Sequence, residues 1–373
     1  MRYSTAIRSR WQVRGLGLLQ SPGFAMFNNI QMLRAFAASL VLIHHAGAHY
    51  QAMGGIWGWF SQLASVGFAG VDVFFVISGF VAAHTTFDKA RSWSNAWHFA
   101  RRRLARIYLG YWPFLAAMMA ITWVFTPAAI PKIDVLGSVF LTTIKLDRLA
   151  IYVTWSLTFE LLFYALVSAT LLLPMRQVNR LVYLAALGVF ASLVATYSQA
   201  HSAVQIFTAM LFEFLAGMLI YMHRQSLGQR WLVPVCALLG GAAFVLGARL
   251  HATDGSIRIF TFGLGAVAWV TLAVALEQTR TYVANRVLVA LGDASYTLYL
   301  SHLLLLAAFY FMGLRDFLAV QSGWVRETGF FLFLAFCLWF SHLLYIVMER
   351  PLYRWAVAFS NTDAVARVNA KAH

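Results

Sequence analysis

Residues 30–50 read IQMLRAFAASLVLIHHAGAHY, and this apolar run decides the fold class. At 1.5 Å per residue it is long enough to cross the ~30 Å hydrocarbon core of a membrane as one helix. Arg34 and His45 are eleven positions apart, about three helical turns, so they share one face about 16 Å apart. A guanidinium inside an apolar helix marks a functional site, and imidazole suits proton transfer near pH 7. The pair predicts anion binding near one membrane face and acid–base chemistry near the other.

The composition of the whole chain is that of an integral membrane protein. Of its 373 residues, 61% are hydrophobic and 11% are charged, whereas soluble domains carry about 25% charged residues. The recurring apolar runs predict an all-α, polytopic membrane helix bundle of about ten transmembrane helices with both termini cytoplasmic. The expected spans are residues 30–50, 66–86, 107–127, 151–173, 181–198, 203–222, 231–248, 258–276, 288–312 and 326–348.

Lysine and arginine are distributed unevenly between the two sides of this topology. The net charge of +15 would suggest nucleic-acid binding in a soluble protein. With the N-terminus inside, however, the inner segments hold 20 of the 28 Lys and Arg residues and the outer loops hold seven. This bias follows the positive-inside rule. The charge therefore reflects membrane topology, and no nucleic-acid partner is expected.

The sequence predicts one membrane domain between two short flanking segments. We expect a basic cytoplasmic N-terminal arm over residues 1–28, a membrane domain over 29–355 and a cytoplasmic tail over 356–373. The two cysteines, Cys236 and Cys337, lie in separate apolar runs without a CxxC partner. Neither a disulfide scaffold nor a metal site is expected.

Two carboxylates lie within predicted spans, where an unpaired charge is costly. Asp72 in the second span and Glu160 in the fourth fall about a third of the way in from the outer face, a depth similar to that of His45. Tyr164 follows Glu160 by four residues, so both share a helix face. A carboxylate beside an imidazole fixes its tautomer and raises its basicity. The three titratable groups predict one acid–base site; a charge network that only fastens the bundle is the structural alternative.

Further polar residues are candidates for substrate contacts. Ser78 and Gly79 allow close approach of a neighbouring helix or of a ligand. Arg103 and Arg106, three residues apart where the third span begins, project the same way. Together with Arg34 they predict a cationic clamp for phosphates, to which planar guanidinium groups are well suited. The structural alternatives are helix packing for the first pair and positive-inside charge for the arginines.

The ninth span carries Tyr296, Tyr299 and His302 at intervals of three residues, on one slowly drifting helix face. His302 is expected to line the same cavity, with a satisfied core histidine as the alternative. In the first span His44 precedes His45. His44 lies about 80° around the helix from the face shared with the arginine, which favours His45 as the reactive residue.

Together these segments resemble the acyltransferase 3 family of ten-helix membrane acyltransferases. Six motifs occur in the family's order and cover nearly the whole chain. They are Gln31-Met-Leu-Arg34 through His45, Gly70-Val-Asp72-Val-Phe-Phe-Val-Ile-Ser78-Gly79-Phe80, Arg103-x-x-Arg106-Ile-Tyr108, Trp155-Ser-Leu-x-x-Glu160-x-x-x-Tyr164, Ser295-Tyr296-x-x-Tyr299-x-x-His302 and Glu349-Arg350-Pro351.

The resemblance implies a multi-pass O-acyltransferase of the bacterial inner membrane. Such enzymes move an acyl group, commonly acetyl, from cytoplasmic acyl-CoA to carbohydrate outside the membrane. It implies acyl-CoA as a co-substrate, no bound cofactor, and an extracytoplasmic or lipid-linked polysaccharide as the acceptor. Acceptor choice then resides in the membrane cavity, the outer loops or a partner such as a polysaccharide-assembly protein. The family's paired arginine and histidine correspond to Arg34 and His45.

The implied reaction and the spacing of the polar residues along the helices together suggest a mechanism. We expect the CoA phosphates at the three arginines and the thioester near His45, which acts either as a general base or as a nucleophile that becomes an acyl-imidazole. Glu160 or Asp72 is expected to orient the imidazole. Tyr164 and Tyr299 are candidate donors to the developing oxyanion.

The same composition permits a different class of protein. Intramembrane Asp, Glu, Arg and His also mark the pathways of proton-coupled transporters for small solutes or glycoconjugates. The absence of inverted repeats and of paired helices broken by Pro or Gly counts against a transporter. A scaffold subunit with vestigial sites is a third alternative.

Overall fold

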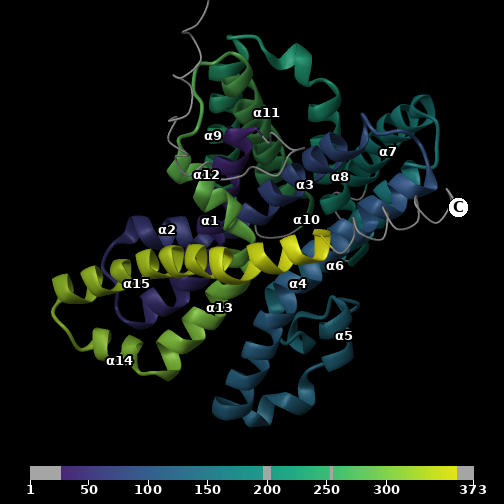
Figure 1. Cartoon of the computed structure of the whole chain (residues 1–373). Coiled ribbons are helices and arrows are strands. Elements are labelled where there is room, and N and C mark those ends of the chain that lie inside the picture. The colour runs from purple at the N-terminus through teal and green to yellow at the C-terminus, as the bar shows by residue number, and fades with distance from the viewer. Residues whose placement is uncertain (1–26, 196–202, 253–254, 359–373) are drawn as a thin grey trace, which may run out of the picture.

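The structure, a computed structural model, describes residues 27–195, 203–252 and 255–358 (Figure 1). Within these ranges every regular element is a helix and no strand occurs, which confirms the expected all-α class. Most of the expected N-terminal arm and of the C-terminal tail lies outside the described residues.

The described chain contains fifteen α-helices joined by short helical turns. The α-helices are α1 (Asn28–Ala52), α2 (Gly58–Val66), α3 (Gly70–Thr86), α4 (Trp93–Phe125), α5 (Val135–Phe140), α6 (Trp155–Thr170), α7 (Met175–Ala195), α8 (Ala203–Met222), α9 (Leu232–Arg249), α10 (Gly255–Arg258), α11 (Leu264–Gln278), α12 (Arg286–Asp293), α13 (Ser295–Phe311), α14 (Leu314–Ala319) and α15 (Gly323–Leu344). The 3-10 turns are η1 (Gly67–Ala69), η2 (Pro127–Lys132), η3 (Leu146–Arg148), η4 (Tyr152–Thr154) and η5 (Arg224–Leu227), and the π-helical segments are η6 (Ile259–Gly263) and η7 (Tyr345–Glu349).

Seven helical stretches of the described chain are long and apolar enough to cross a membrane. An eighth is added if the bent pair α12 and α13 forms one span. Each of the ten expected ranges overlaps a helix. The number of ten spans and the cytoplasmic position of both termini stay predictions.

Two helices differ in detail from the expected spans. α4 starts at Trp93, well before the expected residue 107, because Ser92 caps it by accepting a hydrogen bond from the Asn95 amide at 3.3 Å. The ninth expected span is broken, since α12 and α13 meet at an angle of 64°. The added N-terminal part of α4 carries Arg103 and Arg106 of the predicted arginine clamp.

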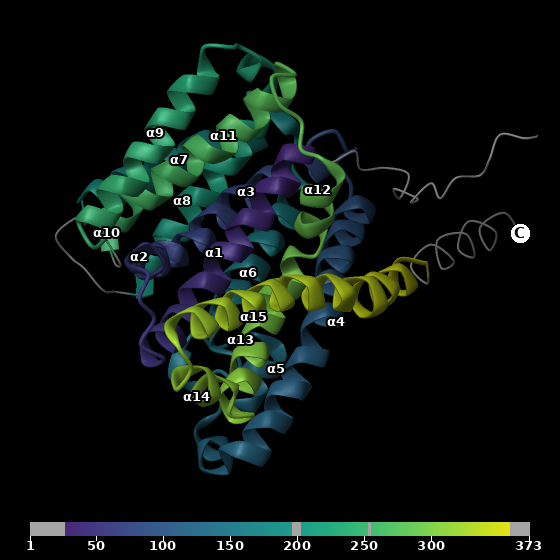
Figure 2. The same ribbon diagram turned by 90° about the vertical axis from the view of Figure 1, so that its left-hand side faces the viewer.

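The helices form two groups around the pair α1 and α3. α7, α8, α9 and α11 gather on one side, whereas α15 crosses α13 on the other (Figures 1 and 2). α7 and α9 point large apolar side chains outward, among them Leu184, Leu187, Leu238 and Leu239. A soluble protein would bury such side chains, so these faces are suited to contact lipid.

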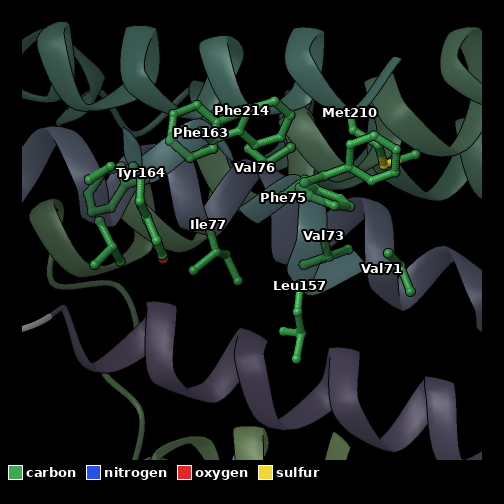
Figure 3. Close-up of a cluster of buried hydrophobic side chains, with 14 of the residues drawn as sticks. Val71, Val73, Phe75, Val76, Ile77, Leu157, Phe163, Tyr164, Met210 and Phe214 are labelled. Atoms are coloured by element: carbon green, nitrogen blue, oxygen red, sulfur yellow. The ribbon is translucent and has the colours of Figure 1, made fainter. Parts of the chain in front are cut away.

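α3 packs tightly between α1 and α8. Gly70 meets the Ala37 carbonyl and Gly67 meets the Leu40 carbonyl, so α1 and α3 run antiparallel. Against α8, Gly79 meets the carbonyl of Phe214. The ring of Phe214 in turn packs at a tilt against Phe163 of α6, at 4.9 Å between centroids, in the buried apolar cluster of Figure 3. α3 is therefore the central helix that fixes both neighbours.

A carboxylate from another helix caps the start of α1. Both oxygens of Glu277 on α11 accept hydrogen bonds, one from the Asn28 amide and one from the Asn29 amide, each at 2.9 Å. The Asn29 side chain donates to the Ala273 and Tyr282 carbonyls and accepts from the Ala284 amide. Negative charge at a helix N-terminus is stabilising. This contact fixes the height of α1 against α11.

We expect Glu277→Ala to lower the free energy of unfolding by about 1–3 kcal/mol, because it leaves two half-buried amide donors unpaired. The matched variant Glu277→Gln keeps one acceptor oxygen and should lose less. Thermal unfolding of the detergent-solubilised protein measures both. Equal melting temperatures for wild type and Glu277→Ala would show that this cap does not stabilise α1.

Candidate active site

A cavity lies between α1, α3, α4, α6 and α13. With its open mouth included it contains about 830 Å³ of unfilled space. Its walls combine apolar side chains of α3 with polar groups from the other four helices. It is lined by Arg34, Val71, Phe74, Phe75, Ile77, Ser78, Val81, Arg103, Arg106, Ile107, Ser156, Leu157, Glu160, Tyr164, Ser295, Tyr296 and Tyr299.

Three arginine side chains from two helices line this cavity. Arg34 of α1 donates through Nε to the Ser295 hydroxyl at 3.2 Å. Arg103 of α4 donates to the Thr85 hydroxyl at 3.1 Å, and its guanidinium carbon lies 4.8 Å from the ring centroid of Tyr164. Each guanidinium carries five N–H donors, so several stay available to an anion. The structure thus brings the expected clamp of Arg34, Arg103 and Arg106 into one cavity.

Glu160 belongs to the same cavity as the arginines. It accepts hydrogen bonds from the Tyr164 hydroxyl at 2.5 Å and from the Ser78 hydroxyl at 3.2 Å. Because the Tyr164 proton is used by Glu160, this hydroxyl is not free to donate to an oxyanion. Two further carboxylates, Glu349 and Asp293, lie near Arg34 without lining the cavity. The arginine side of the cavity is therefore partly charge-balanced.

Tyr299 lines the cavity and also lies beside a histidine. The Tyr299 hydroxyl donates to the Val153 carbonyl at 2.7 Å and lies 2.8 Å from the Ser156 hydroxyl. On its other side the Tyr299 ring is 6.0 Å from the His302 ring. Tyr299 therefore separates the cavity from His302, and its hydroxyl proton is already engaged.

His45 and His302 stack on each other directly beyond Tyr299. Their ring centroids are 5.2 Å apart with an interplanar angle of 24°. His302 is fully buried, and its Nδ1 lies 3.1 Å from the Leu298 carbonyl. A carbonyl can only accept, so Nδ1 of His302 carries a proton and, in the neutral ring, Nε2 a lone pair. Among the described residues this Nε2 has no hydrogen-bond partner.

The two adjacent histidines of α1 have different surroundings. Nδ1 of His44 lies 2.8 Å from the Ala64 carbonyl of α2, which ties that ring to the helix packing. Nδ1 of His45 lies 2.8 Å from the hydroxyl of Tyr152 in η4. Both residues are partly exposed. What distinguishes them is the partner: a backbone carbonyl of α2 for His44 and a tyrosine hydroxyl for His45.

Asp72 lies apart from both groups. It is completely buried and accepts two hydrogen bonds from Arg258 of α10, at 2.8 and 3.1 Å. Glu213 of α8 is buried beside this pair. The expected single acid–base site of Asp72, Glu160 and His45 is not formed, because Asp72 pairs with Arg258 whereas Glu160 and His45 contact other residues. Residue counting gives the position of a side chain along its own helix but not the neighbouring helix that it faces.

Seven of the ten expected site residues line the cavity, and three do not. The seven are Arg34, Ser78, Arg103, Arg106, Glu160, Tyr164 and Tyr299. His45 and His302 form their own stack beside it, and Asp72 pairs with Arg258. Within the described ranges no group of three or more His, Cys, Asp or Glu side chains could hold a metal ion.

Sequence reasoning missed several residues of this region. Ser156 and Ser295 line the cavity, and Tyr152 contacts His45. The two serines stand within motifs that the sequence analysis used, so their hydroxyls could have been considered. No comparable signal marked Tyr152, because its role depends on a 3-10 turn that brings residues 107 positions apart together.

Most of the chain is similar to known proteins. The acyltransferase 3 family, described as an acyltransferase domain, matches residues 27–346. The chain is also similar to the exopolysaccharide production protein ExoZ of Rhizobium meliloti (strain 1021), with 30% identity over 315 residues that cover 78% of this chain and 90% of the relative. No solved structure gives a significant match. The chain therefore belongs to the acyltransferase 3 family of membrane acyltransferases.

Proposed function

We propose that this protein moves an acyl group, acetyl in the first instance, from cytoplasmic acyl-CoA to a hydroxyl group of a polysaccharide on the other side of a bacterial inner membrane. The observation that carries the proposal is the cavity lined by Arg34, Arg103 and Arg106 next to the stacked His45 and His302. Family membership favours an acyltransferase over a transporter. The name of the relative supports exopolysaccharide as the acceptor class.

The arginine cavity suits the phosphates of the donor. Guanidinium groups bind phosphate oxygens through paired, charge-assisted hydrogen bonds. Arg34 and His45 are on the same continuous helix, so a donor held at Arg34 has about 16 Å to span before its thioester reaches His45. An extended pantetheine arm is of that order. Tyr299 contacts both the cavity and His302, so the arm has to pass this ring.

Two routes at His45 stay open. As a general base, Nε2 of His45 takes the proton of the acceptor hydroxyl while its oxygen attacks the thioester carbon. The C–S bond then breaks, and the proton passes from Nε2 to sulfur, which gives the ester and free CoA thiol. As a nucleophile, Nε2 attacks the thioester carbon and the C–S bond breaks, so that the imidazolium loses its Nδ1 proton and the CoA thiolate gains one. The acceptor oxygen then attacks the acyl carbon, the C–Nε2 bond breaks, and the proton of the acceptor hydroxyl restores the neutral imidazole.

The two carboxylates that were expected near His45, Glu160 and Asp72, have different roles in this proposal. The bonds of Glu160 to Ser78 and Tyr164 favour a role in shaping the donor cavity rather than in orienting His45. Asp72 pairs with Arg258 and does not contact His45 or line the cavity. Its catalytic role stays a prediction. Direct acyl transfer by the purified protein from labelled acetyl-CoA to a polysaccharide acceptor tests the proposal as a whole.

We expect Arg34→Gln to weaken acyl-CoA binding about 10- to 100-fold, because a charge-assisted hydrogen bond is worth about 1.5–3 kcal/mol. The turnover rate at saturating donor should change much less. Arg176→Gln, which removes an exposed arginine at the start of α7, is the matched control. Calorimetric titration with CoA measures both. An unchanged affinity in Arg34→Gln would remove this arginine from the donor site.

A further inference from the structure

Tyr152 makes a contact to His45 that neither the family motifs nor the cavity predicts. Its hydroxyl lies 2.8 Å from Nδ1 of His45, and its ring packs edge-on against the imidazole at 5.2 Å between centroids. We propose that Tyr152 is a positioning residue that holds His45 in the tautomer with the proton on Nδ1, so that Nε2 carries the lone pair that reacts. The inference rests on the proposed function only in that His45 is the reacting residue.

The assignment of the tautomer follows from the donors and acceptors of the two groups. A neutral imidazole has one N–H and one lone pair, whereas a phenol can donate or accept. If Tyr152 donated to Nδ1, the ring proton would be on Nε2, and His45 would offer no lone pair on its other edge. When Tyr152 accepts from Nδ1–H, Nε2 is free to take a proton or an acyl group. Either route at His45 therefore requires Tyr152 to be the acceptor.

Because Tyr152 is exposed, accepting a hydrogen bond from His45 costs it little free energy. The residue is 42% exposed, which leaves space for an oxygen of water or of the acceptor substrate to accept the hydroxyl hydrogen of Tyr152. A neutral phenol also differs from a carboxylate in what it does to the ring. It fixes the orientation without strongly stabilising an imidazolium, so a proton taken up at Nε2 is readily given to the leaving sulfur.

The turn that carries Tyr152 is itself firmly held. Its neighbours Ile151, Val153 and Thr154 are buried. The Thr154 hydroxyl donates to the Ile151 carbonyl at 2.8 Å, and the Val153 carbonyl accepts from Tyr299 at 2.7 Å. η4 therefore contacts the cavity wall through Val153 and His45 through Tyr152. This rigid support is what a positioning residue needs.

Kinetics of Tyr152→Phe give the first test. The phenylalanine ring keeps the edge-on packing and removes only the hydroxyl. We expect the turnover rate to fall about 10- to 100-fold, while the KM for acyl-CoA stays within about twofold because Tyr152 does not line the cavity. Tyr183→Phe is the matched control, since the exposed Tyr183 hydroxyl lies 2.5 Å from Nε2 of His223 and should be dispensable.

A spectroscopic measurement separates positioning from a merely structural role. In protein labelled with ¹⁵N-histidine, the His45 signals are those lost in His45→Gln. We expect wild type to show Nδ1 protonated and Nε2 unprotonated, and Tyr152→Phe to show a mixture of tautomers. A wild-type His45 protonated on Nε2 would overturn the inference. So would a Tyr152→Phe protein with wild-type turnover while His45→Gln is inactive, whereas an active His45→Gln would overturn the proposed function instead.

Discussion

Replacement of His45 by alanine is expected to lower the rate of acyl transfer about 10³- to 10⁴-fold. In both proposed routes Nε2 of this ring takes part in bond making, either as the base or as the nucleophile, and no other group in the described structure has the same position on the Arg34 face. Affinity for CoA should stay within about threefold, because His45 does not line the arginine cavity. Rates with radiolabelled acetyl-CoA and calorimetric binding of CoA measure the two effects separately.

His44 provides the control for this experiment. It is adjacent in sequence, but its ring is tied to the Ala64 carbonyl rather than to Tyr152. His44→Gln keeps a side chain that can donate to this carbonyl and should retain most of the activity. An inactive His44→Gln beside an active His45→Ala would move the reacting residue to the other helix face and contradict the assignment.

Replacement of Gly79 by valine is expected to prevent folding into the native bundle. A Cβ at Gly79 would overlap the Phe214 carbonyl of α8, and a Cβ at Gly217 would overlap the Val76 carbonyl of α3. The two glycines thus let the backbones of α3 and α8 touch from both sides, as small residues do between membrane helices. Neither obstacle is a flexible side chain, so the helices would have to separate and the cluster around Phe214 would open. We expect a monodisperse wild-type peak and an aggregated Gly79→Val protein in size-exclusion chromatography.

Gly241 of α9 is the matched position, because a Cβ there would meet no atom within 4 Å. Gly241→Ala should elute as wild type does and melt at the same or a slightly higher temperature. If Gly79→Val were as stable as Gly241→Ala, the tight contact between α3 and α8 would not exist as described.

The helical class and most of the cavity lining could be predicted from the sequence, because both depend on local rules. Charged residues are rare in apolar helices, which draws attention to Arg34, Arg103 and Arg106. Helix periodicity then predicts which residues of one helix share a face. Gly79 was expected to allow close approach, but its partner was not. Gly217 is inconspicuous until the register of α8 against α3 is known.

Which titratable groups contact one another could not be predicted from the sequence. Residue counting estimates the depth of a side chain in the membrane, but not its position in the plane of the membrane. Asp72 was expected beside His45, and instead pairs with Arg258, 186 residues further along the chain. Glu160 was expected to orient His45 and instead contacts Ser78 among the donor-cavity residues. Tyr152 was not expected at all, since only the folded η4 turn brings it to His45. Each of these contacts depends on which face of one helix meets another.

The central claim is acyl transfer from CoA through His45 to a carbohydrate hydroxyl. Its most direct test uses purified protein in liposomes, [¹⁴C]acetyl-CoA and an exopolysaccharide oligosaccharide acceptor, with the label on the acceptor measured as an alkali-labile ester. We predict stoichiometric release of CoA thiol and ester label with wild type, and neither above background with His45→Ala. Wild-type protein that binds CoA but forms no ester, or a His45→Ala protein that forms it at the wild-type rate, would contradict the account.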